Sequence, residues 1–356
     1  MSDRLPPRPA PPAPWPAMLL TAGLGTRLAP LSDLAAKPAL PVAGVPLAGR
    51  ILRWLAAGGV ADAVLNLHHR PESITAAIGD GGAFGVRVRY SWEPRVLGSA
   101  GGPARALPML DADRFFLVNG DTLTDLDLAA LAALHAESGA SVTLAVVPNP
   151  DPLHYGGVSV DVDGLVTGFT EPGPDNSGWH FIGVQAVERS VFARLDPDEP
   201  ANTVSGIYRE LLASRPGAVR AMTAAAAFFD IGTAADYLDT CLAIGRAEGL
   251  GDVLAGARTE VRAGARVTRS VLWDDVVVAD RAALDECVVA GEVHIPAGLR
   301  LSRRVVVPRG DHAPVAGAEL AGDLLVTPLD AQRRRASLDR SHHLRTAADA
   351  SHENGF

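Results

Sequence analysis

The chain has 356 residues, of which 47% are hydrophobic and 21% charged, a mix typical of a globular protein with a sizeable core. Lys and Arg number 32 against 41 Asp and Glu, so the net charge of −9 excludes a general basic surface for nucleic acid or for an anionic membrane. No apolar run approaches the roughly 18 residues of a membrane span, the N-terminus lacks a signal-peptide pattern, and Cys241 and Cys287 form no CxxC pair, so we expect a cytoplasmic protein.

The first residues alternate Pro with Ala and Arg, and we expect a leader with little fixed structure over residues 1–15. From Trp15 onward, short apolar runs alternate with helical patterns. The runs are PAMLLTAG, ADAVLNLHH, VRVRYSW, RFFLVNGD and SVTLAVVP, and the helical patterns are PLAGRILRWLAAGG, ESITAAIGD, GPARALPML and LAALAALHAESG. This alternation predicts an α/β fold with a Rossmann-like, mainly parallel sheet covered by helices on both faces.

Residues 156–188 change character, because they read as a hairpin that turns at Asp163-Gly164 followed by the strand HFIGVQAVE. We therefore expect an antiparallel insertion in the sheet. Helical patterns follow in GIYRELLAS and in AADYLDTCLAIGRAEG, which ends on Gly249. We assign residues 16–250 to one catalytic domain.

After about residue 254, Val or Leu recurs every five to seven residues between small and polar ones. This spacing predicts a short β-helix of hexapeptide type over residues 251–328, with a plain β-sandwich as the alternative. Residues 329–356 contain almost no large apolar side chains and are expected to form a polar tail.

The stretch LLTAGLGTRLAPLSDLAAKPALPV follows the first predicted strand directly. Gly23 and Gly25 let backbone N–H groups approach a phosphate or a base edge. A Rossmann fingerprint would need glycine at Leu28, and the Gly-Lys-Ser/Thr of a P-loop is absent. Arg27 and Lys37 beside the glycines can clamp a polyphosphate, whereas the alternative is a rigid surface loop with incidental charges.

Two aspartates come at the ends of predicted strands. Asp121 follows RFFLV, and Asp230 follows AAAAFF and is expected in an equivalent place. Ligands bind at the carboxyl ends of strands in open α/β sheets, and Mg²⁺ needs only one or two carboxylates besides waters and phosphates. The alternative for Asp121 is a capping or turn residue.

The motif AGLGTRLAPLSDLAAKPALPV resembles that of the sugar-1-phosphate nucleotidyltransferases, the NDP-sugar pyrophosphorylases. Further segments agree in order: LGSAGG at 97–102, VNGD at 118–121, YGG at 155–157 and FDIGTAADYL at 229–238. The resemblance covers about residues 17–245, and the repeat after it resembles the left-handed β-helix that many members append. The combination is most similar to the mannose-1-phosphate guanylyltransferase-like branch.

The resemblance implies that Arg27 and Lys37 act in catalysis and that Asp121 and Asp230 bind Mg²⁺. It implies a nucleotide-binding set of Leu20, Ala22, Gly23, Gly25, Thr26, Arg27, Gly98, Ser99, Ala100 and Gly120. It also implies a sugar-phosphate-binding set of Tyr155, Gly156, Glu171 and Gly183.

The implied reaction joins a nucleoside triphosphate, for which we favour GTP, to a sugar 1-phosphate, for which we favour mannose 1-phosphate. Alternatives are a uridylyltransferase acting on N-acetylmuramate or another hexose 1-phosphate, and a catalytically weak NDP-sugar-binding regulator. The family's Lys between Glu171 and Pro172 is missing, its Asn is replaced by His180 or Phe181, and SWEPRVLGS lacks a base-reading Gln. We expect self-association, if any, through the C-terminal region and no nucleic-acid or membrane partner.

Overall fold

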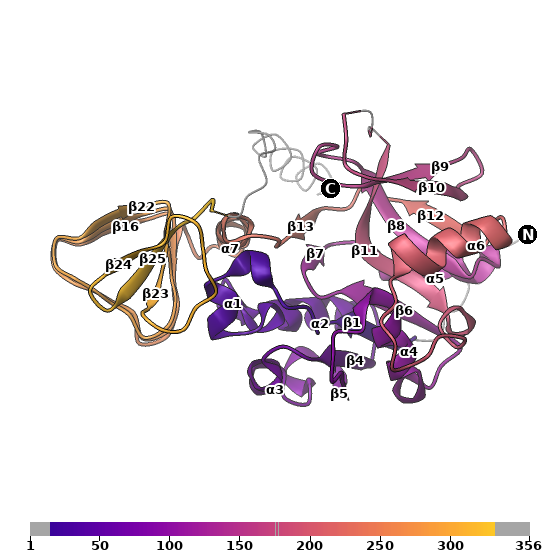
Figure 1. The fold of residues 1–356 in the computed structure, drawn as a ribbon, viewed down its shortest axis with the longest axis horizontal. Helices are drawn as coiled ribbons and strands as arrows, with labels where there is room; N and C mark the ends of the chain where they lie inside the picture. The colour runs from indigo at the N-terminus through magenta and orange to yellow at the C-terminus, as the bar shows by residue number, and fades with distance from the viewer. Residues whose placement is uncertain (1–14, 175, 177, 332–356) are drawn as a thin grey trace, which may run out of the picture.

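The computed structural model describes residues 15–174, 176 and 178–331, so the expectations for the leader through residue 14 and for the tail beyond residue 331 lie outside the described residues (Figure 1). The helices are α1 (Leu31–Leu34), α2 (Leu47–Ala57), α3 (Pro71–Ile78), α4 (Gly98–Leu110), α5 (Leu128–Ser138), α6 (Tyr208–Ser214) and α7 (Ala234–Ala247). None of the described helices is long and apolar enough to span a membrane.

A nine-stranded sheet organises the described residues of the first two thirds of the chain. Its strands are β1 (Ala17–Leu20), β4 (Asp62–Leu67), β5 (Arg87–Trp92), β6 (Arg114–Asn119), β8 (Val142–Pro148), β9 (Gly157–Val160), β10 (Val166–Thr170), β11 (Trp179–Glu188) and β12 (Val219–Thr223). The order β5-β4-β1-β6 is parallel throughout, which confirms the predicted parallel sheet. β11 joins β6 in the antiparallel sense, and β8 pairs with both β11 and β12.

Helices cover both faces of this sheet, as the alternating sequence patterns predicted. Along β1, Ala17 and Leu19 belong to one apolar cluster and Met18 to the other, because successive side chains of a strand point to opposite faces. The first cluster holds buried side chains of α2, α3, α5 and α7, and the second those of α4 and α6. The core therefore lies in two layers that fix the strand ends between them.

The predicted antiparallel insertion is confirmed. β9 and β10 pair in the antiparallel sense around a turn in which the N–H of Gly164 donates to the Asp161 carbonyl at 3.1 Å. The pairing of β11 with β8 shifts register between Phe181 and Gln185, and Gly183 lies inside that irregularity with a φ of 79°. β11 therefore bends where it passes the end of β6.

The expected place of Asp230 was wrong. β12 ends at Thr223, and the chain then forms a separate short strand, β13 (Phe228–Asp230), which pairs antiparallel with β7 (Thr122–Thr124) outside the main sheet. The alanine-rich run that leads to Asp230 is thus a connection rather than a continuous core strand. The register nevertheless pairs Asp230 with Thr122, so the two aspartates are close neighbours.

The C-terminal region is a β-helix of three parallel sheets. The first contains β14 (Val253–Ala255), β17 (Ser270–Leu272), β20 (Val288–Val289) and β23 (Arg304–Pro308), the second β15 (Glu260–Val261), β18 (Val277–Val278) and β21 (His294–Ile295), and the third β16 (Arg266–Thr268), β19 (Ala283–Asp285) and β22 (Arg300–Ser302). Residue 253 pairs with 270 and residue 271 with 288, so one coil takes 17 residues. The β-helix interpretation is confirmed and the β-sandwich alternative is wrong.

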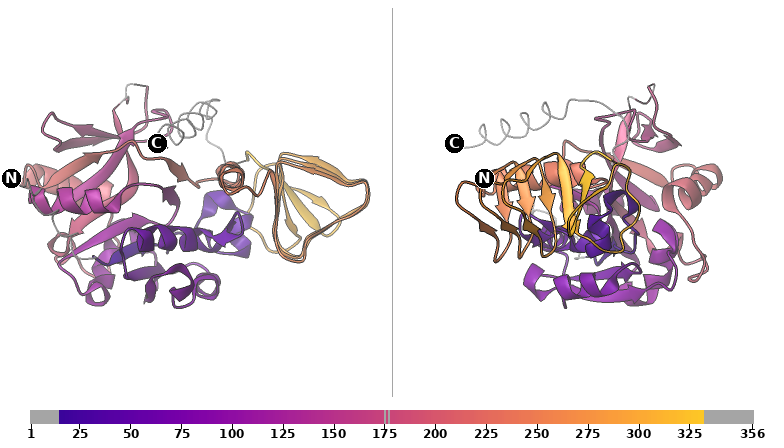
Figure 2. Two further views of the ribbon diagram at one scale, coloured as in Figure 1. Left: turned by 180° about the vertical axis from the view of Figure 1, so that it is seen from behind. Right: turned by 60° about the vertical axis from the view of Figure 1, so that its left-hand side comes forward.

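An antiparallel hairpin that the sequence did not predict continues the first sheet of the β-helix. It consists of β24 (Glu319–Ala321) and β25 (Leu324–Pro328), and β25 pairs with β23. A smaller hairpin of β2 (Pro41–Val42) and β3 (Val45–Pro46) precedes α2 in the other half of the molecule. The β-helix lies at one end of the long axis, beyond α1 and α7 (Figures 1 and 2).

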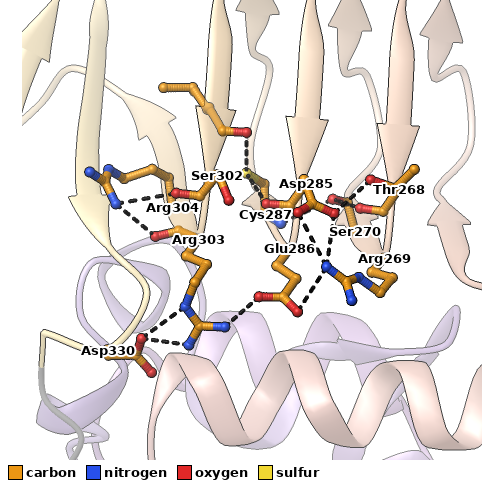
Figure 3. A network of polar contacts seen from close by, with 11 residues as sticks. Thr268, Arg269, Ser270, Asp285, Glu286, Cys287, Ser302, Arg303, Arg304 and Asp330 are labelled. Atoms are coloured by element: carbon orange, nitrogen blue, oxygen red, sulfur yellow. Dashed lines mark hydrogen bonds and ion pairs between the residues drawn. The ribbon is translucent and has the colours of Figure 1, made fainter.

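Charged side chains stack along one corner of the β-helix in alternating sign. Arg269, Glu286 and Arg303 follow one another at intervals of one coil, and the Glu286 carboxylate forms ion pairs with both arginines (Figure 3). Arg303 also donates to the Asp330 carboxylate at 2.5 Å. All three corner residues have a φ between 43° and 54°, so their backbone turns sharply there. The corner therefore links successive coils and the segment that follows β25.

Candidate active site

A cavity of about 340 Å³ opens at the carboxyl ends of β1, β4 and β6, where ligands bind in open α/β sheets. Its lining combines three segments that lie far apart in the sequence: the glycine loop after β1, the start of α4, and the residues after β6. The lining residues are Leu20, Thr21, Ala22, Gly23, Gly25, Thr26, Arg27, Leu28, Lys37, Pro38, Asn66, Glu93, Val96, Gly98, Ser99, Asn119, Gly120, Asp121 and Gly232. Most of the predicted nucleotide-binding and catalytic residues are thus brought together.

The glycine loop folds back on itself because Gly25 has a φ of 64°, in the left-handed region. A side chain at this position would be strained, and its Cβ would lie 3.3 Å from Ser32 Cβ and 3.5 Å from Lys37 Cβ. The close approach carries Lys37 to the same wall of the cavity as Arg27. The two cations that the sequence separates by ten positions therefore face one space.

Lys37 is the only lysine in the sequence, and the other 31 basic residues counted as Lys or Arg are arginines. Its Nζ donates to Asp121 Oδ2 at 2.9 Å, and its side chain is 13% exposed. An ammonium is a compact point charge, whereas a guanidinium is a planar fork. A chain that otherwise uses arginine keeps the point charge here, a signal that the sequence analysis did not use.

The pKa values of the two aspartates are shifted in opposite directions. Burial alone would raise the pKa of Asp121, but the Lys37 ammonium and the Arg27 guanidinium hold it below its ordinary value. Burial and the Asp121 charge raise the pKa of Asp230 to about 6, against the opposing effect of Lys37. Two carboxylates therefore share one site at a cost in charge repulsion, which a bound divalent cation would relieve.

α4 begins at the cavity, and its first turn is held by the segment before the π-helix at Thr203–Ile207. Gly98 has a φ of 76°, and a Cβ there would lie 2.6 Å from the Ala201 carbonyl oxygen. Ser99 Oγ accepts from the Thr203 N–H at 2.9 Å. The predicted residues Gly98 and Ser99 line the cavity, but Ala100 is fully buried and donates its N–H to the Ala201 carbonyl.

A buried polar network that the sequence analysis missed forms part of the cavity wall. Glu93 is 0% exposed, and its two oxygens accept from Asn66 Nδ2 at 2.7 Å and from the Leu97 N–H at 3.0 Å. Asn66 Oδ1 in turn accepts from the Thr21 N–H at 2.6 Å. No cation among the described residues forms an ion pair with Glu93. A polar residue inside the apolar run DAVLNL and an acid directly after β5 were the available signals.

The predicted sugar-phosphate residues lie outside this cavity. Tyr155 and Gly156 precede β9, and Glu171 is exposed directly after β10. At Gly183 the backbone of β11 approaches β6 so closely that a Cβ would lie 2.7 Å from Asn119 Nδ2. Gly120 lines the cavity, and its N–H donates to the Leu20 carbonyl at 3.0 Å. A Cβ at this position would collide with that carbonyl oxygen, so only glycine allows the close approach of the two strand ends.

The described residues contain no group of three or more His, Cys, Asp or Glu side chains arranged to hold a metal ion. A cation held by Asp121 and Asp230 would need waters and substrate oxygens as its other ligands, and Mg²⁺ usually binds proteins in this way. The arrangement thus offers two cations, two carboxylates and a helix start around one cavity. Together these groups suit a ligand that carries several phosphates.

Comparison with known proteins agrees with this chemistry. Residues 16–246 match the family described as Nucleotidyl transferase. A mannose-1-phosphate guanylyltransferase of Mycobacterium tuberculosis is 32% identical over 297 residues, which cover 81% of this chain and 83% of that protein. An N-acetylmuramate alpha-1-phosphate uridylyltransferase of Neisseria meningitidis is 37% identical over 202 residues, 56% of this chain and 86% of that protein. The crystal structure of HddC from Yersinia pseudotuberculosis complexed with GMP-PN superposes with a TM-score of 0.55 at 25% identity, covering 64% of this chain and 98% of that one.

Proposed function

We propose that this chain, which belongs to the nucleotidyl transferase family, joins GTP to mannose 1-phosphate and releases GDP-mannose and pyrophosphate. The observation that carries the proposal is the cavity in which Arg27, Lys37 and Asp121 meet the glycine loop and the start of α4. That set of groups can hold a triphosphate and neutralise it without help from a general basic surface. The acidic net charge of −9 is therefore compatible with a polyanionic substrate.

Glu93 supports guanine as the base. A carboxylate accepts hydrogen bonds, and guanine presents two adjacent donors, N1–H and the N2 amino group, on its Watson–Crick edge. Uracil presents one N–H between two carbonyl oxygens, which a carboxylate repels. Glu93 lines the cavity and forms no ion pair with a cation of the described residues. Each of its oxygens accepts one hydrogen bond, from Asn66 Nδ2 or from the Leu97 N–H, and keeps a further lone pair that a base could use. The crystal structure of HddC, which is similar to this chain, is complexed with GMP-PN.

The relatives support mannose 1-phosphate as the sugar substrate. The mannose-1-phosphate guanylyltransferase is similar over a stretch longer than the family match, so its likeness extends into the β-helix, whereas the uridylyltransferase is similar over 202 residues only. Activity on N-acetylmuramate 1-phosphate with UTP remains the second candidate. The missing Lys between Glu171 and Pro172 favours one further alternative, a catalytically weak regulator that binds an NDP-sugar.

The reaction is attack by a phosphate oxygen of the sugar 1-phosphate on the α-phosphorus of the triphosphate. A phosphate monoester loses its second proton near pH 6, so this nucleophile is already charged at neutral pH and needs no general base. The protein has to bring two polyanions into line and reduce their repulsion. Arg27 and Lys37 supply positive charge where the phosphates meet, and the Gly25 loop holds both at fixed positions.

Mg²⁺ is the cofactor we propose, held by Asp121 and Asp230, and when bound it would neutralise phosphate charge. Lys37 Nζ donates to Asp121 Oδ2 at 2.9 Å, so an ammonium group and the first carboxylate lie side by side. Asp230 lies on β13, which is tied to β7 by the pairing of Asp230 with Thr122. The position of the second carboxylate is thus set by backbone hydrogen bonds rather than by its own loop. We also propose the cytoplasm as the location of the reaction and the C-terminal β-helix as the region through which the chain would self-associate.

Pyrophosphate release measured with four nucleoside triphosphates and a panel of hexose 1-phosphates in the presence of Mg²⁺ tests the proposal. We expect the highest kcat/KM with GTP and mannose 1-phosphate. Arg27→Ala and Asp121→Ala should each lower turnover by about 100-fold or more, the scale of losing one preorganised charge. Arg89→Ala, which removes an exposed guanidinium from the edge strand β5, is the control. Binding of NDP-sugar without turnover for any substrate pair would favour the regulator instead.

A further inference from the structure

Gly232 lies in the cavity wall, between the end of β13 and the start of α7. Its φ is not in the left-handed region, so the backbone conformation does not itself require glycine. A Cβ at this position would lie 3.2 Å from Arg27 Nη1, 3.5 Å from Arg27 Cζ and 3.3 Å from Asp236 Oδ2. Glycine is therefore needed for space, because a guanidinium and a carboxylate face each other across it.

Asp236 is fixed at the start of α7. Its Oδ2 accepts from the Thr233 N–H at 3.0 Å and from the Thr233 hydroxyl at 2.9 Å, and its own N–H donates to Thr233 Oγ1 at 3.2 Å. These reciprocal hydrogen bonds form a capping box, and Asp236 is only 3% exposed. The carboxylate therefore has a defined position next to Gly232.

Arg27, in contrast, is an exposed residue on a single turn, Thr26–Leu28, which has no side-chain cap. A long arginine side chain on such a turn samples many rotamers unless another group holds its end. A positive charge that acts on phosphates in the transition state must already be oriented when the reaction begins. The proposed catalytic role of Arg27 therefore requires an anchor for its guanidinium.

The Asp236 carboxylate also requires a cation beside it. Burial and the charges of Asp121 and Asp236 raise the pKa of Asp230 to about 6, so Asp236 belongs to the same charged cluster as the two proposed metal ligands. A third buried acid beside two others costs free energy unless a cation lies next to it. The Arg27 guanidinium, across Gly232, meets this requirement.

We propose that Asp236 is the positioning residue of Arg27, and that its carboxylate holds the guanidinium against Gly232 so that the positive charge is in place before the phosphates bind. The inference rests on the proposed function and adds to it a residue to which neither the sequence analysis nor the comparisons give a role. Asp236 is not among the residues that line the cavity, so it acts through Arg27 rather than on the substrate.

The same short segment then serves both halves of the site. Asp230 ends β13, and Asp236 lies in the first turn of α7. Between them, the buried Ile231 donates its N–H to the Asp121 carbonyl at 3.1 Å. One segment thus sets the second metal carboxylate and the partner of Arg27 together.

A double-mutant cycle measured by pyrophosphate release with GTP and mannose 1-phosphate tests the inference. Asp236→Asn keeps the shape and an oxygen that can accept from Thr233, and it removes the charge. It should lower kcat about tenfold and leave KM within about twofold of the wild type, because the misplaced charge acts mainly in the transition state. In an Arg27→Ala background the same substitution should have no further effect on kcat. Equal losses of kcat in both backgrounds would overturn the inference, since Asp236 would then act independently of Arg27.

Asp127→Asn is the matched control, because it makes the same change in a capping aspartate of another helix, α5. Asp127 Oδ1 accepts from the N–H groups of Ala129 and Ala130 at 2.9 and 3.0 Å. This variant should keep the wild-type kcat. A comparable fall of kcat in Asp127→Asn and Asp236→Asn would show that a weakened helix cap is sufficient, and the positioning role would be refuted.

A second measurement does not depend on turnover. Phenylglyoxal modifies guanidinium groups, and peptide mass mapping gives its rate at Arg27 relative to Arg89, an exposed residue of β5. Without substrates, Arg27 should react about threefold to fivefold faster in Asp236→Asn than in the wild type, because no carboxylate holds it. An equal relative rate would overturn the inference and leave the proposed function standing. A faster rate in a chain whose wild type releases no pyrophosphate would establish the contact while the proposed function fails.

Discussion

Glu93→Gln replaces the buried carboxylate with an amide of nearly the same shape, and we expect it to change both base selectivity and stability. The two Glu93 oxygens accept from Asn66 Nδ2 and from the Leu97 N–H. The amide of Gln has only one oxygen, so its NH₂ group must face one of those donors. A buried donor without an acceptor costs about 1–3 kcal/mol, and we expect the free energy of unfolding to fall by that amount.

The free energy that Glu93→Gln loses in binding guanine should be similar in size to the loss of stability. A bidentate contact to a base edge discriminates by about 1–3 kcal/mol, which corresponds to a factor of roughly 5 to 150 in kcat/KM. Because UTP does not use the carboxylate in this way, the ratio of kcat/KM for GTP over UTP should fall by that factor, about 5- to 150-fold, in Glu93→Gln. Pyrophosphate release with each triphosphate measures the ratio, and denaturant unfolding measures the stability.

Glu72→Gln is the matched control, since Glu72 is exposed in the first turn of α3. It should leave both the ratio and the free energy of unfolding within error. An unchanged ratio in Glu93→Gln, together with the expected loss of stability, would refute the argument that Glu93 reads the base and would leave it a structural acid. An equal fractional fall of kcat/KM with all four triphosphates would likewise indicate that Glu93 has a structural role and does not read the base.

Three further predictions concern charge. Lys37→Arg should lower kcat by about 100-fold although it conserves the charge, because a planar guanidinium replaces a compact ammonium. Reagents that acylate amines can modify only Lys37 and the N-terminal amine of the wild type. GTP should slow the acylation of Lys37, as measured by peptide mass mapping. Because the pKa of Asp230 is raised to about 6, the Mg²⁺ affinity measured by calorimetry should fall about tenfold per pH unit below that value. Asp230→Asn should remove this dependence of the affinity on pH. A wild-type affinity that stays constant down to pH 5 would contradict the assignment of Asp230 as a metal ligand. Burial lowers the pKa of His135 from 6.5 to about 4, so the unfolded chain binds a proton at a higher pH than the folded chain does. The free energy of unfolding should therefore fall as the pH drops from 6.5 towards 4, by roughly 3 kcal/mol from this residue. His135→Gln should show a shallower dependence of the free energy of unfolding on pH, and an equal dependence would contradict the argument.

The sequence predicted the parts of the site that depend on local chain geometry. Gly25 and Lys37 belong to one continuous motif, and Asp121 follows a strand whose apolar pattern is unambiguous, so their convergence at the sheet edge followed from the α/β pattern. Glu93 and Asn66 could not be found this way, since Asn66 is one polar residue on β4 and Glu93 one acid directly after β5, and they meet only after β4 and β5 pair. The place of Asp230 was misjudged for a related reason: an alanine-rich run has no period, and hydrogen bonding to β7 decides where the strand forms.

The β-helix helps to hold the loop that carries Arg27 and Lys37, although it lies far from this loop in the sequence. The described helical turns between Thr26 and Ala39 have no side-chain cap of their own. Donors from other elements hold the loop instead: the Ala313 N–H donates to Asp33 Oδ2 at 2.9 Å, and the Tyr237 hydroxyl donates to the Pro41 carbonyl at 2.5 Å while accepting from Trp273 Nε1 at 2.9 Å. Asp33 and Pro41 lie on either side of Lys37 in the sequence, so the position of the only lysine depends on contacts with α7 and the β-helix. Loss of the β-helix would therefore weaken phosphate binding through a looser Lys37, even with every residue that lines the cavity intact.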